Sequence, residues 1–592
     1  MIEPKPEYER RLQGWRERIA ALDSSHLIIS NSRLGIAAAA VLVFWLSIVR
    51  NAIAVEWLLA PVVAFVALIV IHARVLQRVE RARRAALWYA RGLDRLDGRW
   101  TRRARDGERF TGLHPCARDL DLFGRASLFE LLNTANTEAG EETLAHWVAE
   151  GASNPEVTRR HAAVDELRTK IDFREDLAVL SAESDVSRTG TMAAWARAEP
   201  AGLGTASAII LVACAIVMLA VAALVFGDRL ASGWLLGWLL VEMALALAWR
   251  RPVQLVLGRI ATADRDLALV RDVLARIETE SFAAPRLAQI RDSLLTRGVP
   301  PSQRIAQLRR LVSWLDSTRN QMFAPIAFAL LLPQLLAVAI DRWHAAYGAH
   351  VVEWLNGIGE LEAFSAVGTY AFEHPRDPFP ELVEGGPVFE AAAVAHPLMP
   401  ESACVPNDVA LGGAAPHVLV VSGSNMSGKS TLLRSVGVNV VLALMGAPIR
   451  ASRLRVSPVC VGATLKVEDS LQAGHSRFYA EILRIRDIVA GARTTPTMFL
   501  LDEILHGTNS YDRRIGAEAI VRALVSLNAI GLVTTHDLAL TELPEKLGGV
   551  ALNMHFEDRL ENGLLAFDYR MRPGVVQHSN ALALMRAVGL DV

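Results

Sequence analysis

One short stretch of the sequence limits what this chain can fold into. Residues 423–430 fit the pattern GxxxxGK[ST] without a mismatch, within the segment GSNMSGKST. An apolar segment typical of a buried strand, HVLVVS, comes directly before it, and we expect a helix directly after it. Glycines in such a loop let backbone N–H groups close around phosphate oxygens, and the helix N-terminus adds partial positive charge. The sequence therefore predicts a phosphate-binding loop in an α/β domain.

The residue types inside this loop predict what it binds. Lys429 is expected to reach the β- and γ-phosphates of ATP, and the Ser430 hydroxyl is expected to hold Mg²⁺. ATP and Mg²⁺ are thus the predicted cofactors. The predicted nucleotide-binding residues are Gly423, Ser424, Asn425, Met426, Ser427, Gly428, Lys429, Ser430 and Thr431.

Two further strand ends carry residues that would complete such a site. The segment MFLLDE ends a predicted buried strand with Asp502 and Glu503, about 70 residues after the loop. We expect Asp502 to orient the Mg²⁺ shell and Glu503 to polarise the attacking water. The segment LVTTHD ends another strand with His536, whose side chain is expected to sense the γ-phosphate. A histidine that only caps or packs is the alternative.

Two pairs of apolar runs have the length of membrane spans. The first pair covers residues 34–49 and 52–73, and the second covers residues 201–226 and 230–249. Each run approaches the roughly 20 apolar residues that cross a bilayer. Short links join the members of each pair, so we expect two transmembrane helical hairpins. Buried core helices are the alternative.

Arginines flanking these runs predict their orientation. Arginine clusters precede the first hairpin and follow both hairpins, whereas each tip carries a single one, Arg50 or Arg229. Positive residues favour the cytoplasmic side, so both hairpins are expected to enter the membrane from the cytoplasm and return. The expected location is the inner or cytoplasmic membrane, with every soluble part cytoplasmic. For the basic stretch 74–109, contact with anionic lipid is favoured over contact with DNA.

Two carboxylates and a fifth apolar run need separate interpretation. Glu56 lies near a predicted interface and is expected to be solvated. Glu242 lies deeper, where a hydrogen bond within the helical bundle is favoured over a proton pathway. The run 323–340 is shorter and contains Pro325 and Pro333. We expect it to form a buried or interfacial helix rather than a membrane span.

The remaining sequence predicts a division into helical and α/β parts. Outside the hairpins, apolar residues recur at helical spacing up to about residue 371, and beyond it apolar strands alternate with helices, which is typical of a parallel sheet. The predicted fold class is α plus α/β: two transmembrane helical hairpins, an all-α region and a C-terminal P-loop ATPase domain with a mostly parallel sheet. The predicted boundaries are 1–33 for an N-terminal cytoplasmic helix, 34–73 and 201–249 for the hairpins, 74–200 and 250–371 for the helical region, and 372–592 for the ATPase domain.

Composition adds few constraints. Apolar residues make up 52% of the chain and charged residues 21%, which is apolar for a soluble protein but too polar for a chain made only of membrane spans. The net charge is −1, so the chain as a whole lacks a basic excess suited to nucleic acid. Its four cysteines are scattered without a CxxC pair, which predicts neither a disulfide framework nor a zinc site.

Taken together, these motifs resemble the MutS family of DNA mismatch-repair ATPases. The loop GSNMSGKST is similar to that family's GPNMGGKST, and EDSLQAGHSRFYAE resembles the family segment that follows the loop. LLDEILHGTNSYDR resembles the family's acidic pair with its signature loop, and TTHDLAL resembles its histidine switch. The resemblance is close over residues 394–590 and weaker over residues 120–167, which look like the start of the family's helical core.

The resemblance implies composite ATP sites in a dimer. It implies catalytic roles for Lys429, Glu503 and His536, with Mg²⁺ held by Ser430 and Asp502. The signature loop would reach in trans to the nucleotide of the partner subunit, and its residues here are Gly507, Thr508, Asn509 and Ser510. Asn509 stands where the family commonly has serine, a departure that bears on this contact.

Other departures from the family shape the predicted function. We find no counterpart of the family's mismatch-reading domain, and the second hairpin interrupts the lever region. We therefore expect a membrane-anchored MutS-like ATPase, a homodimer in contact with lipid whose ATP-driven closure moves helical arms. Two substrates stay open: DNA clamped by the arms, and an unidentified membrane partner. An ABC-type ATPase of a membrane transport or envelope assembly, without a DNA role, is the alternative.

Overall fold

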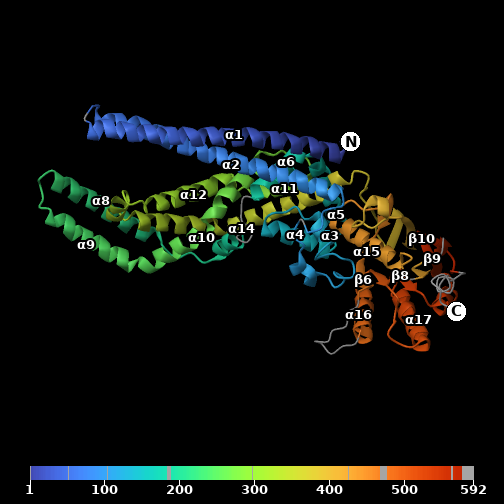
Figure 1. Ribbon diagram of the computed structural model, residues 1–592. Coiled ribbons are helices and arrows are strands. Elements are labelled where there is room, and N and C mark those ends of the chain that lie inside the picture. Colours follow the sequence, from blue (N-terminus) through green and yellow to red (C-terminus); the bar gives the residue numbers. More distant parts are fainter. Residues whose placement is uncertain are drawn as a thin grey trace.

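The protein is elongated, with helices at one end and two sheets at the other (Figure 1). The computed structural model describes residues 2–50, 52–102, 104–182, 189–296, 298–424, 426–466, 477–561 and 564–576. Two helical hairpins project toward one end of the molecule, and the sheets with their flanking helices form the opposite end. A body of helices joins the two ends.

The first hairpin is built from two long helices. α1 (Pro4–Phe44) continues through a π-helical turn at Trp45–Val49, and α2 (Leu59–Leu96) returns beside it after a 3₁₀ turn at Val55–Leu58. The charged N-terminal segment and the first apolar run, predicted as separate parts, therefore lie on one continuous helix. No proline follows Pro6 before the hairpin tip, so no residue of that kind ends the helix between them.

Buried polar contacts tie the base of the first hairpin to the helical body. Tyr8 is fully buried and its hydroxyl donates to Glu373 at 3.2 Å. The Arg95 guanidinium donates to the same carboxylate from two nitrogens, at 2.8 and 2.6 Å. A buried charge is stable only when it is paired and hydrogen-bonded, as it is here. The hairpin is thereby fixed to the C-terminal end of α14 (Leu332–Glu373).

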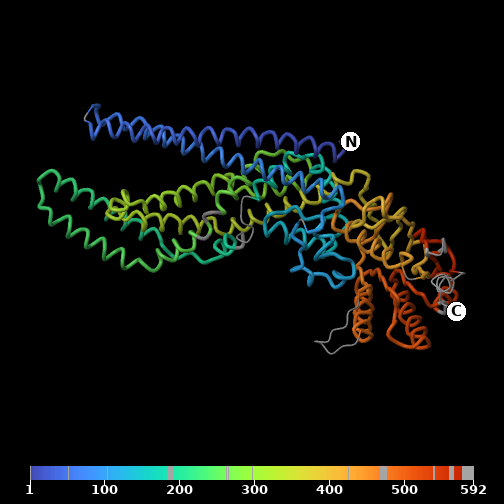
Figure 2. The backbone as a smooth tube through the Cα atoms, viewed as in Figure 1, coloured from blue at the N-terminus to red at the C-terminus, as the bar shows by residue number. Residues whose placement is uncertain are grey.

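The second hairpin lies at the same end of the molecule as the tip of the first (Figure 2). It consists of α8 (Thr205–Phe226) and α9 (Gly233–Ala248), and α10 (Arg250–Thr279) follows α9 after a bend of 65°. Large apolar side chains are exposed over both hairpins, among them Leu34, Trp57, Leu59, Phe226, Trp234 and Leu240. Exposing such a surface to water is unfavourable, because transferring apolar side chains out of water lowers the free energy.

Length and composition mark three stretches as able to cross a membrane, Pro4–Val49, Val55–Leu96 and Thr205–Phe226. The bent pair of Gly233–Ala248 and Arg250–Ala261 would make a fourth if it is one span.

The two carboxylates of the apolar runs have different surroundings. Glu56 is exposed, as expected. Glu242 is fully buried in α9, and neither of its carboxylate oxygens has a hydrogen-bond partner among the described residues. The indole of Trp238, one turn earlier, donates to the Cys214 carbonyl instead. The hydrogen bond expected for Glu242 stays a prediction, with the Trp238 indole as the neighbouring donor.

The run 323–340 is not a single helix, which corrects the sequence prediction. It divides into α13 (Ala324–Ala329) and the start of α14, and the break falls at Leu331, whose φ is +49°. Pro325 and Pro333 each stand in the first turn of one helix, where the missing N–H costs nothing. Leu331 is buried, but Ile326 and Phe328 are exposed, so the run is only partly buried.

The long helix α14 is the centre of the helical body. It packs against α4, α5, α7, α10 and α12. Its Glu362 accepts hydrogen bonds from the backbone N–H groups of Asn136 and Thr137, at 3.3 and 3.1 Å, where α4 begins. The other helices of the body are α3 (Leu128–Leu132), α4 (Glu138–Ala149), α5 (Asn154–Thr169), α6 (Ile171–Ser181), α7 (Thr189–Arg197), α11 (Pro285–Ser293) and α12 (Pro301–Ser317).

Two sheets form the opposite end. The larger has the strand order β10-β9-β4-β8-β7-β6; all neighbours are parallel except β10, which is antiparallel to β9. The smaller has the order β1-β5-β2-β3. The mostly parallel sheet agrees with the sequence prediction. The strands are β1 (Glu381–Leu382), β2 (Val388–Val394), β3 (Asn407–Gly412), β4 (Val418–Ser422), β5 (Arg453–Val456), β6 (Cys460–Thr464), β7 (Thr497–Leu501), β8 (Ile530–Thr535), β9 (Ala551–Glu561) and β10 (Leu564–Pro573). Helices α15 (Lys429–Met445), α16 (Arg477–Ala492), α17 (Ser510–Ser526) and α18 (Leu543–Lys546) belong to this end.

The register of the larger sheet brings three strand ends together. Ser422 of β4 pairs with Thr535 of β8, and Leu501 of β7 pairs with Val533 of β8. Because these strands are parallel, their carboxyl ends meet at one edge of the sheet. The segments that follow β4, β7 and β8 therefore converge at this edge.

Candidate functional site

The loop between β4 and α15 wraps around the Lys429 ammonium. Lys429 is the first residue of α15, is only 4% exposed, and donates from Nζ to the carbonyls of Gly423 and Ser424, each at 2.8 Å. Gly423 and Gly428 have φ values of +156° and +104°, and Met426 has +71°. These left-handed conformations favour glycine and let the chain turn tightly before the helix. Asn425 lies outside the described residues.

The electrostatics around Lys429 suit a phosphate. Burial lowers the pKa of the Lys429 ammonium, while the nearby carboxylates of Glu503 and Asp502 act in the opposite direction. The Oγ atoms of Ser424 and Ser427 are buried and have no hydrogen-bond partner among the described residues. Buried hydroxyls normally find partners, so these two atoms fit a ligand with acceptor oxygens at this loop.

The acidic pair predicted from the sequence follows β7 and is held by the next strand. Thr534 of β8 is fully buried, and its hydroxyl donates to the carboxylate of Asp502 while accepting from the backbone N–H of Glu503 at 3.0 Å. Glu503 has a φ of +48°, an uncommon conformation for a side chain with a Cβ. One threonine hydroxyl thus fixes both members of the pair.

The loop after the acidic pair is also held firmly. The buried carboxylate of Glu481 accepts from the Leu505 N–H at 2.7 Å, and burial raises its pKa. The Arg513 guanidinium donates to the carbonyls of Leu505, His506 and Thr508, each at 3.2 Å. Any side chain at Gly507 would collide with Phe478, whose Cβ lies 2.7 Å from an ideal Cβ there.

Within its own chain, the predicted signature loop forms the start of α17. Asn509 is the N-cap, and its Oδ1 accepts from the Asp512 N–H at 2.9 Å. Its amide nitrogen donates to the Asp512 carboxylate at 2.7 Å. Gly507, Thr508, Asn509 and Ser510 do not line the cavity described below. Whether they reach a partner subunit stays a prediction.

Two histidines approach the Glu503 carboxylate. His536 follows β8 and its Nδ1 lies 3.5 Å from Glu503 Oε1. His506 comes from the loop after β7 and its Nδ1 lies 3.9 Å from Glu503 Oε2. His536 was singled out by the sequence, whereas His506 was not.

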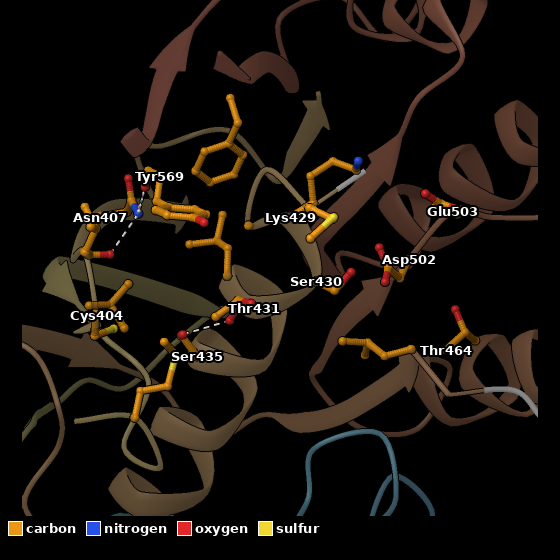
Figure 3. Close-up of a pocket in the computed structure, with 18 of the residues that line it drawn as sticks. Cys404, Asn407, Lys429, Ser430, Thr431, Ser435, Thr464, Asp502, Glu503 and Tyr569 are labelled. Carbon is orange, nitrogen blue, oxygen red and sulfur yellow. Dashed lines mark hydrogen bonds between the residues drawn. The ribbon is translucent and has the colours of Figure 1, made fainter. Parts of the chain in front are cut away.

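These groups surround a cavity of about 590 Å³ (Figure 3). Lys429, Ser430 and Thr431 line one side, and Asp502, Glu503 and His506 line another. Ser430 and Asp502 face each other across it. Gly428 and Met426 also line it, whereas Gly423, Ser424, Ser427 and His536 are not among its lining residues.

The far side of the cavity was missed by the sequence analysis. Met399, Cys404 and Val405 line it together with Tyr569. Tyr569 stands on β10, and Asn407 positions it by donating to its carbonyl at 3.0 Å and accepting from the Met571 N–H at 2.7 Å. This largely apolar wall offers a surface for a flat ring, opposite the charged wall.

The arrangement has the hallmarks of an α/β domain that binds nucleotide phosphates: a strand, a tight loop, a helix and a buried lysine, with an acidic pair at the end of β7, the next strand but one in the sheet. Comparison with known proteins narrows the class. Residues 419–591 match the family model described as MutS domain V. This end of the chain is therefore similar to the ATPase domain of the MutS family.

One curated relative shows how far this similarity extends. A Drosophila melanogaster protein described as "Probable DNA mismatch repair protein Msh6" is 29% identical over 311 residues, which are 50% of this chain and 25% of that protein. The chain therefore spans about a quarter of the length of this relative.

Proposed function

We propose that this protein is a membrane-anchored MutS-like ATPase. The observation that carries the proposal is the buried Lys429 opposite Asp502 and Glu503, at the edge where β4, β7 and β8 end. A cavity of about 590 Å³ between them has one charged wall and one largely apolar wall, which suits a nucleotide with a phosphate chain and a base.

Each residue has a role in ATP hydrolysis that its position supports. Lys429 and the backbone N–H groups at the start of α15 bind the β- and γ-phosphates. Ser430 and Asp502 hold Mg²⁺, which supplies positive charge to the phosphate oxygens. Glu503 orients and polarises the attacking water, and Thr534 keeps its backbone in place.

The exposed apolar surface of the two hairpins supports the membrane anchor. Side chains such as Leu34, Trp57, Phe226 and Leu240 would be exposed to water unless lipid or another protein covers them. Flanking arginines favour a cytoplasmic location for the sheets and the helical body. The inner or cytoplasmic membrane is thus the proposed location.

ATP-dependent closure of a homodimer is the proposed source of movement. The loop of Gly507, Thr508, Asn509 and Ser510 would meet the nucleotide of the partner subunit. Because α14 extends from the sheets to the hairpin end, closure of the ATPase domains would displace the hairpin bases. Hydrolysis at Glu503 would then reverse the displacement.

Two substrates are compatible with this motor. The similarity to a protein described as a DNA mismatch repair protein favours DNA, clamped by the helical arms through phosphate contacts. The hairpins favour a membrane partner instead. Recognition of mismatched bases is not part of the proposal.

ATP turnover by the full-length protein in detergent tests the proposal. Wild-type protein is compared with Lys429→Ala and Glu503→Gln, and each is measured with homoduplex, mismatched and branched DNA over a series of salt concentrations. We expect turnover that both substitutions abolish. Stimulation by DNA that fades with salt supports the clamp, and turnover indifferent to DNA supports a membrane partner. Equal turnover in wild type and Lys429→Ala would refute the ATPase.

A further inference from the structure

Three side chains outside the predicted Mg²⁺ pair, Ser430 and Asp502, meet beside the cavity: Glu503 and His536, which have proposed roles in hydrolysis, and His506, which has none. Glu503, His506 and His536 present one carboxylate and two imidazoles whose ligand atoms all lie within 4.8 Å of one another. His506 Nδ1 and His536 Nδ1 lie 3.9 and 3.5 Å from different oxygens of the same carboxylate. The two imidazole rings stand edge to face, with centroids 5.3 Å apart.

These distances suit one metal ion. Zn²⁺ binds histidine nitrogen and carboxylate oxygen at about 2.0–2.2 Å, so two ligands in a tetrahedral shell lie about 3.4 Å apart. The separations of 3.5 and 3.9 Å need only small side-chain rotations to reach that value. The histidine side chains are 48% and 40% exposed, so an ion can reach them from solvent.

The backbone that carries Glu503 and His506 is already fixed. Thr534 accepts from the Glu503 N–H, and Glu481 accepts from the Leu505 N–H. The Arg513 guanidinium donates hydrogen bonds to three carbonyls of the loop, including that of His506. A site whose ligands stand on a held backbone loses little conformational entropy when the ion binds.

We propose that Glu503, His506 and His536 form a transition-metal site of the two-histidine, one-carboxylate kind, which takes an ion such as Zn²⁺ or Co²⁺. Such transition-metal ions bind well to imidazole nitrogen, whereas Mg²⁺ prefers oxygen ligands such as those of Ser430 and Asp502. Resting on the proposed ATPase function, the consequence is inhibition: the bound ion occupies the Glu503 carboxylate and withholds it from the attacking water. Cysteine spacing gave no hint of this site, because no cysteine belongs to it.

Spectroscopy tests the site without ATP. Co²⁺ is titrated into the full-length protein in detergent with millimolar Mg²⁺ present, and visible absorption reports tetrahedral or five-coordinate Co²⁺; Zn²⁺ is then added to displace it. His506→Ala should weaken binding at least about tenfold, since even supporting residues of metal sites contribute that much. His350→Ala is the matched control, because His350 also pairs with a carboxylate, Glu353 at 2.8 Å, on exposed helix surface far from the site.

The outcomes separate the site from the proposed function. One equivalent of Co²⁺ that is displaced by Zn²⁺, lost in His506→Ala and kept in His350→Ala supports the site. No Co²⁺ spectrum, or one unchanged by His506→Ala, overturns it. Turnover at fixed Mg²⁺ that Zn²⁺ suppresses in wild type and in His350→Ala, but not in His506→Ala, supports the inhibition. Turnover unaffected by a bound ion overturns it, and absence of any turnover refutes the ATPase while the Co²⁺ result stands.

Discussion

Thr534 bonds both members of the proposed catalytic pair, Asp502 and Glu503, and replacing it by valine tests the geometry of the site. Valine keeps the shape of threonine and suits the buried strand β8, but it has no hydroxyl. The change removes the donor to Asp502 and the acceptor of the Glu503 N–H in one step. No other described contact of the Thr534 hydroxyl is lost.

The expected size of the effect follows from these two bonds. A hydrogen bond to an ionised group contributes about 1.5–3 kcal/mol, and a buried N–H without its acceptor costs about 1–3 kcal/mol. If about 1.4–2.8 kcal/mol of this energy is lost from the stabilisation of the transition state, because Asp502 and Glu503 are displaced, kcat falls about 10- to 100-fold. The Mg²⁺ concentration for half-maximal turnover should also rise, because Asp502 loses its orienting donor.

The fall in kcat and the rise in the Mg²⁺ requirement are measured as ATP turnover of the full-length protein over a Mg²⁺ series, and the thermal midpoint reports its stability. Thr535→Val is the control: Thr535 is 3% exposed and stands next in the same strand, but its hydroxyl bonds the backbone of Asp537. The control should lose similar stability and keep turnover within about twofold of wild type. Wild-type turnover and Mg²⁺ dependence in Thr534→Val would refute the role assigned to this hydroxyl.

Three further predictions concern residues that do not line the cavity. Arg513→Met removes the three guanidinium bonds to the loop carbonyls and should lower turnover about tenfold, whereas Arg514→Met on the same helix should not; equal effects would contradict this. Burial lowers the pKa of His396 to about 4, so this histidine is neutral in the folded protein at pH 7. Stability is then complete above about pH 6.5 and falls as the pH drops toward 4, by about 2 kcal/mol between pH 7 and 5 for this histidine. Thermal unfolding at these pH values should depend less on pH in His396→Asn, and an unchanged pH dependence would argue against this histidine. Glu362→Ala leaves the first N–H groups of α4 without their acceptor and should cost about 2–4 kcal/mol, against little for Glu353→Ala on the exposed side of α14; similar thermal midpoints would refute it.

Residues that lie next to each other in the sequence were predicted well. The loop ending in Lys429 and the pair Asp502 and Glu503 each follow a continuous apolar strand, so a local pattern was enough to find them. The partners that hold them were not found. Thr534 matters only because β8 lies between β4 and β7, and that neighbourhood is a property of the folded sheet.

Long-range pairing explains the other missed residues. Tyr569 reaches the cavity through β10, where the register with β9 shifts between Phe567 and Met571. His506 meets His536 only when the ends of β7 and β8 are adjacent. The division of the run 323–340, by contrast, has a local cause that the sequence analysis did not use: each of its two prolines stands in the first turn of a helix.

The length of α14 means that a small tilt at one end produces a large displacement at the other. At 1.5 Å per residue, its 42 residues extend about 63 Å, from beside α8 of the second hairpin to the sheets. A rigid rod of that length tilted by about 10° at one end moves its other end by about 11 Å. The same rod transmits load in reverse, because a coupling between two sites acts equally in both directions. If the proposed membrane anchor and ATPase are correct, lateral tension on the second hairpin would therefore alter nucleotide affinity at Lys429, and the membrane would act on the ATPase as well as hold it.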